Sequence, residues 1–133
     1  MSGALSVQGQ RISASWLNMT IPGGWKAIPL LAGWANHGNG SPVLQARFLN
    51  SAVLQVVGNL NPGTLTNGTT IGVLPSASMY PANTQQSLGA ILAGTGAGGT
   101  FPVSTFSNGS IQISNLSSGV TYVSVNYLIS LDA

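Results

Sequence analysis

The sequence predicts an all-β protein, a single antiparallel β-sandwich of the jelly-roll type. Three observations support this. Glycine (18 residues) and proline (7 residues) occur along the whole chain of 133 residues and oppose long helices. Apolar residues recur with a period of two, and turn sequences separate the apolar runs. We expect about eight to ten short strands, as in sandwiches and barrels, in a domain over residues 24–133.

The first 23 residues form a separate segment. Ile12, Ala14 and Trp16 alternate with polar residues, and the apolar phase then reverses, which indicates a bend near residues 16–17. Residues 22–24 (Pro-Gly-Gly) follow as a hinge. An extended segment can add to the sheet edge of a neighbour. Residues 1–23 are therefore either an arm that docks on other proteins of an assembly or the first strand of the sandwich.

Two central segments are predicted to be strands. Residues 53–57 are apolar on both faces, which favours a strand buried on both sides. Residues 85–93 contain the only candidate for a helix, but Gly89 weakens it and a strand is favoured.

The clearest elements lie towards the C-terminus. Asn108-Gly109, between Phe106 and Ile111, predicts a hairpin with a type I′ turn. In the last strand, apolar residues alternate with Ser124, Asn126 and Ser130, the pattern of a half-buried strand. The predicted core comprises Trp25, Val53, Val57, Ile111, Ile113, Val123, Val125, Tyr127 and Ile129.

The scarcity of charge excludes several function classes. Charged residues make up 3% of the chain, with Arg11, Lys26, Arg47 and Asp132 as its charged side chains and a net charge of +2. An ordinary domain has about 25%. With no glutamate, no cysteine and one histidine, we expect no enzyme, no catalytic residues, no metal site and no cofactor. Three scattered cations do not form a nucleic-acid footprint.

The same composition points to assembly. Ser, Thr, Asn and Gln replace the charges, and a surface with almost no net charge favours association. We expect much of the surface to be buried against copies of the chain or a larger assembly. The longest apolar stretch, residues 27–35, is broken by Pro29 and Gly33 and is far shorter than the ~20 residues of a membrane-spanning helix. No membrane insertion is therefore expected.

Aromatic and amide side chains suggest where a ligand would bind. A tryptophan, an asparagine and the single histidine lie close together in a glycine-rich loop, residues 34–40. Aromatic faces beside amide groups suit sugars, although an ordinary exposed loop histidine is the alternative. Trp16 and Trp25 are assigned to the core or to a subunit interface, and Tyr122, on the polar face of the last strand, to a groove or subunit contact. The candidate ligand contacts are Trp34, Asn36, His37 and Tyr80.

An ordered set of short motifs extends from residue 24 to about residue 131. It begins with a tryptophan-rich stretch of residues 24–38, and the further motifs are residues 46–48, 53–58, 67–71, 74–75, 79–81, 108–113 and 122–125. This ordered set resembles a module of bacteriophage tail-fibre tips and minor tail proteins. Ala46 stands where the family usually has an aromatic residue.

The resemblance implies a small β-sandwich that assembles as a homotrimer in a virion and has no enzymatic activity. The expected function is that of a minor tail or fibre-tip component that contacts the host surface, with a host cell-surface glycan as ligand and other virion proteins bound through residues 1–23. Family members usually sit at the end of a long protein, whereas here the module is nearly the whole chain. The alternative is therefore a trimeric capsid decoration protein that stabilises the shell and binds no host ligand.

Overall fold

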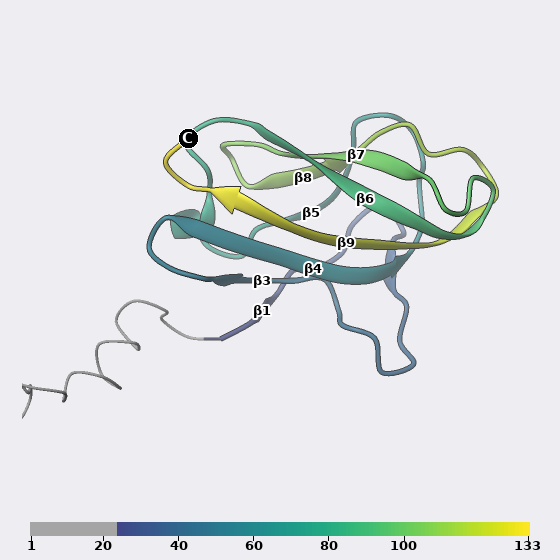
Figure 1. The fold of residues 1–133 in the computed structure, drawn as a ribbon, viewed down its shortest axis with the longest axis horizontal. Coiled ribbons are helices and arrows are strands. Elements are labelled where there is room, and N and C mark those ends of the chain that lie inside the picture. The colour runs from purple at the N-terminus through teal and green to yellow at the C-terminus, as the bar shows by residue number, and fades with distance from the viewer. Residues whose placement is uncertain (1–23) are drawn as a thin grey trace, which may run out of the picture.

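The computed structural model describes residues 24–133, and the segment predicted to be a docking arm or first strand, residues 1–23, lies outside the described residues. The described part consists of strands and one short 3-10 helix, η1 (Figure 1). The elements are β1 (Lys26–Ala27), β2 (Ala35–Asn36), β3 (Gln45–Phe48), β4 (Val53–Asn61), β5 (Thr69–Val73), η1 (Ala77–Met79), β6 (Gln85–Gly94), β7 (Thr100–Thr105), β8 (Ser110–Ile113) and β9 (Val120–Ser130).

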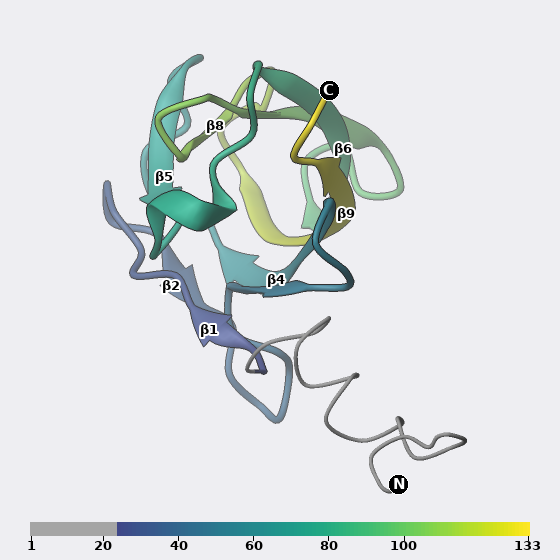
Figure 2. The same cartoon turned by 90° about the vertical axis from the view of Figure 1, so that its left-hand side faces the viewer.

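All strand pairs in the described residues are antiparallel and belong to one sheet, in the order β1-β3-β4-β9-β6-β7-β8-β5, with β2 paired to β4. The sheet curls until its two ends meet (Figure 2). Leu30, just after β1, bridges to Gly72 of β5, and the amide of Leu31 donates to the carbonyl of Ile71 (2.9 Å). The prediction of an antiparallel all-β fold is confirmed. The two layers of the predicted sandwich are the two halves of one curled sheet. Residues 85–93 lie in strand β6, as predicted.

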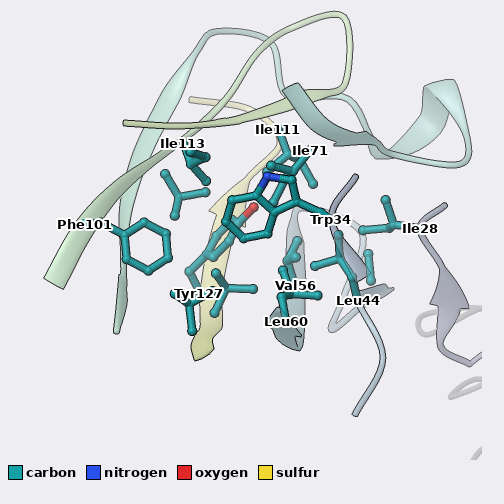
Figure 3. Packing of buried hydrophobic residues seen from close by; sticks show 14 of the residues in the cluster. Ile28, Trp34, Leu44, Val56, Leu60, Ile71, Phe101, Ile111, Ile113 and Tyr127 are labelled. Carbon is teal, nitrogen blue, oxygen red and sulfur yellow. The ribbon is translucent and has the colours of Figure 1, made fainter. Parts of the chain in front are cut away.

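The core lies inside the curl (Figure 3). On β9, alternate residues point inward, and Ile111 and Ile113 of β8 face them from across the interior. The structure places these predicted core residues in the buried cluster: Ile111, Ile113, Val123, Val125, Tyr127 and Ile129.

Strand β4 is buried on one face, and the prediction that Val53 and Val57 lie in the core is wrong. Both valines are half-buried on the outer face, while Leu54, Val56 and Leu60 point inward. The close approach of Leu44 to Gly58 explains which face of β4 points inward. Gly58 also points inward, and a Cβ atom on it would lie 2.7 Å from Cα of Leu44. Glycine at this position lets the chain before β3 approach the strand.

One buried polar pair interrupts the apolar core. Thr105 of β7 and Tyr127 of β9 are buried, and their hydroxyl oxygens are 3.2 Å apart. Burial raises the pKa of the Tyr127 phenol to about 12, while the hydrogen bond with Thr105 acts in the opposite direction. One hydroxyl donates to the other, so each takes part in a hydrogen bond within the core.

The hairpin between β7 and β8 is present, but its turn is not type I′. The amide of Gly109 donates to the carbonyl of Phe106 (2.8 Å). A type I′ turn needs positive φ at both central residues, and here Gly109 has it (φ 85°) whereas Asn108 does not. Asn108 instead accepts a hydrogen bond from the amide of Ser110 through its side chain (3.0 Å). This is the pattern of a type I turn followed by a left-handed glycine.

Candidate functional site

An open groove lies on the outer face of the sheet, over β4 and β9 and beside the segment that leads into β3. Its volume is about 350 Å³. The floor comes from the paired strands β4 and β9, so residues about 65 positions apart in the sequence meet there. The lining residues are Trp25, Pro42, Gln45, Val57, Gly58, Asn59, Ser124, Val125 and Asn126.

Trp25 forms one wall of this groove, and its assignment to the core is wrong because its side chain is 38% exposed. Lys26 pairs with Ala46, so Trp25, one residue earlier, lies opposite Arg47 on the outer face. The Arg47 guanidinium lies 4.4 Å from the centre of the Trp25 ring, a cation–π contact. This contact holds an exposed aromatic ring at the edge of the groove.

A line of hydrogen bonds crosses the outer face from Arg47 to the groove. Arg47 Nε donates to Oε1 of Gln55 (3.1 Å). Gln55 Nε2 in turn donates to Oδ1 of Asn126 (3.2 Å), which lines the groove. These bonds connect β3, β4 and β9 and fix the orientation of the Asn126 amide.

A second cluster borders the groove through Asn59. The His37 ring stacks on Tyr122 with 3.9 Å between ring centres and an angle of 12° between the planes. His37 Nδ1 is 2.9 Å from Oδ1 of Asn61, an acceptor, so this bond requires the proton on Nδ1. Asn59 Nδ2 donates to the Tyr122 hydroxyl (2.9 Å). Tyr122, which was predicted to line a groove or a subunit contact, therefore packs against His37 and is hydrogen-bonded to Asn59.

The structure does not bring the four predicted ligand contacts together. Trp34 is buried (5% exposed), and its Nε1 donates to the carbonyl of Thr64 (2.9 Å), so its prediction as a surface contact is wrong. Figure 3 shows its indole inside the core. It follows a left-handed turn at Ala32 and Gly33 that turns the chain inward.

The other three candidates have structural contacts. Asn36 is exposed, and its Oδ1 accepts a hydrogen bond from the amide of Leu44 (2.9 Å), which ties β2 to the start of β3. His37 is half-buried in the stack with Tyr122. Tyr80 is half-buried with its ring against Gly109 of the β7–β8 turn.

Sequence analysis missed Gln45, Asn59 and Asn126 as members of one surface. Each lies at an outward position of its strand, which alternation alone indicates. Their proximity depends on the pairing of β3 with β4 and of β4 with β9, and no local pattern encodes that pairing.

The site contains no metal centre in the part of the chain that the structure describes: among residues 24–133, no three histidine, cysteine, aspartate or glutamate side chains gather. Within the same range, none of the helices has the length and hydropathy needed to cross a membrane.

Comparison with known proteins gives a fold without a sequence family. No family model matches the chain, and no curated protein matches it. Among solved structures, the head domain of lactococcal phage bIL170, a receptor-binding domain, is similar with a TM-score of 0.59 and 20% identity, over 81% of this chain and 97% of that one. The receptor-binding protein gp15 of Listeria phage PSA is similar with a TM-score of 0.64 and 15% identity, over 87% of this chain and 70% of that one. At these identities the likeness establishes a shared fold.

Proposed function

We propose that this chain is a bacteriophage virion protein, a minor tail or fibre-tip component that binds the host cell surface as a homotrimer. The fold is shared with receptor-binding domains of two phages. The proposed role is binding without catalysis, and the proposed ligand is a cell-surface glycan.

The observation that carries the ligand assignment is the groove itself. It combines an exposed aromatic ring, Trp25, with the side chains of Gln45, Asn59 and Asn126 in one open depression. A sugar ring presents an apolar face and a rim of hydroxyl groups. Aromatic surface with a few placed amides matches both parts.

Arg47 gives the groove a positive edge but does not line it. The side chains that do line it are uncharged. Recognition would therefore depend on shape, stacking and neutral hydrogen bonds, and it would change little with salt.

Binding of the labelled protein to a panel of bacterial cells and to their purified cell-wall polysaccharides tests this function. Gln45→Ala and Trp25→Ala should each weaken binding at least tenfold on the strain that binds the wild-type protein, because each removes a groove wall. The matched control is Gln112→Ala, which changes a half-buried strand glutamine of β8 outside the groove and should leave binding unchanged. Equal binding by all four proteins would contradict the assignment of the groove.

The number of copies in purified particles, measured by quantitative mass spectrometry, separates the tail location from the capsid alternative. A low number consistent with the symmetry of a tail supports the proposed function. A number that follows the capsid lattice, together with no binding to cells, would instead favour the decoration protein.

A further inference from the structure

Three leucines are exposed on neighbouring strands of the outer face. Leu88 and Leu92 of β6 are 62% and 45% exposed, and Leu128 of β9 is 57% exposed. Leu88 pairs with Pro102 of β7, and Leu128 pairs with Gln55 of β4. The three leucines and Pro102 form what we call the leucine patch, which adjoins the groove on the same face of the sheet.

The leucine patch has a polar surround that carries no charge. Its outward neighbours include the amides and hydroxyls of Gln86 on β6, Ser104 on β7 and Asn126 on β9, and Ala90 lies between Leu88 and Leu92. The charged side chains of residues 24–133 are Lys26, Arg47 and Asp132. None is on β6, β7 or β9, and Arg47 on β3 is separated from Leu128 by Gln55 of β4. An apolar centre with a polar rim is the usual anatomy of a protein interface.

This pattern of charge favours one occupant, another copy of the same chain. A symmetric assembly brings identical surfaces, or surfaces of identical chains, together. A carboxylate or an ammonium group repels its own copy, whereas a glutamine, asparagine or serine side chain both donates and accepts hydrogen bonds and can pair with its own copy. Gln86, Ser104 and Asn126, which border the leucine patch, are side chains of this second kind.

We propose that copies of this chain associate through the leucine patch, with the edge of the groove at the interface. Gly89 pairs with Val125, so Leu88, one residue earlier, lies opposite Asn126, which lines the groove. This inference rests on the proposed homotrimer for the existence of an assembly and adds the surface that forms it.

The test compares the wild-type chain with the double variant Leu88→Thr/Leu128→Thr by light scattering over a range of concentrations. Threonine keeps the strand propensity of these exposed sites. We expect the concentration of half-association to rise at least tenfold in the double variant. Leu31→Thr is the control because Leu31 is 45% exposed and lies outside the patch, between β1 and β2, and it should associate like the wild type.

A second measurement does not depend on the stability of the double variant. The chain has no cysteine, so Leu88→Cys and Leu31→Cys each introduce a single thiol. Alkylation of the Leu88→Cys variant should slow at least tenfold from dilute to concentrated solution, while the Leu31→Cys variant should react at one rate.

Three outcomes would overturn the inference: a wild-type chain that stays monomeric at every concentration, a double variant that associates like the wild type, or equal alkylation of both thiols at high concentration. Both measurements are made without a ligand. Failure of host-cell binding with intact association would refute the proposed ligand binding and leave the interface standing. Host-cell binding by a chain that stays monomeric would refute the interface and the homotrimer and leave the ligand binding standing.

Discussion

The buried phenol of Tyr127 should make the free energy of unfolding of this protein fall as the pH rises above 10. Its pKa is raised to about 12 from 10.0 by burial. The phenol is neutral in its protonated form, so the folded state holds the proton more tightly than the unfolded state. The contribution of this raised pKa to the stability of the folded state is fully present below pH 10 and is lost as the pH rises from 10 through 12.

A shift of two pKa units corresponds to about 3 kcal/mol, of which about 2 kcal/mol is lost by pH 12. This is a large part of the 5–15 kcal/mol that holds an ordinary domain folded. Tyr127→Phe removes the titration. It also leaves the hydroxyl of Thr105 without its partner in the core, at a cost of about 1 kcal/mol.

Loss of the hydrogen bond destabilises Tyr127→Phe at every pH, whereas loss of the titration makes it relatively more stable at high pH. The wild-type protein and the variant should therefore exchange their order of stability as the pH rises. Urea unfolding at pH 8 should find the wild type more stable by about 1 kcal/mol, and at pH 12 the Tyr127→Phe protein should be the more stable by a similar amount, with a crossing near pH 11. The other ionisable groups are present in both proteins, so their titration cancels in the difference. A stability difference that stays constant from pH 8 to pH 12 would refute the assignment of a shielded phenol.

Three other perturbations test the fold and its assembly. Val125→Asp places an unpaired charge at a site that is 2% exposed, at a cost of several kcal/mol; circular dichroism should find the variant unfolded, and a soluble folded variant would contradict the core. Gly109→Ala should lose more thermal stability than Gly40→Ala, since both glycines have positive φ (85° and 78°) but only the Cβ at position 109 would overlap the Tyr80 ring; equal melting temperatures would show that Tyr80 does not pack there. Association should be almost unaffected by ~1 M NaCl, because few charges exist to be screened, and dissociation by salt in light scattering would argue for an ionic interface.

The sequence was most informative where one face of a strand is buried and the other is polar. In β9, Val123, Val125, Tyr127 and Ile129 point inward, as predicted, although Leu128 places one apolar side chain on the outer face. In β4 the apolar residues occupy both parities, so alternation gives no phase. The phase depends on Gly58, whose missing side chain admits Leu44, and this approach involves a partner 14 positions earlier in the sequence.

The two tryptophans of the tryptophan-rich stretch, residues 24–38, have the opposite of their predicted locations for a similar reason. Trp34 is in the core because its indole nitrogen finds the carbonyl of Thr64, 30 residues away. Trp25 is at the surface because β1 pairs with β3 and places it over Arg47. Neither partner is close in sequence, so local composition could not tell which tryptophan needed burial.

Asn126 connects the two proposals of ligand binding and association. It lines the groove, receives a hydrogen bond from Gln55, and lies opposite Leu88 at the edge of the leucine patch. A ligand in the groove and a neighbouring copy on the patch would then contact adjacent parts of one surface. By linkage, a ligand that touches both copies must tighten their association by the same factor by which association tightens ligand binding. A chain with so few charges can use the same neutral amides for both contacts, because an amide serves a sugar hydroxyl and its own copy equally well.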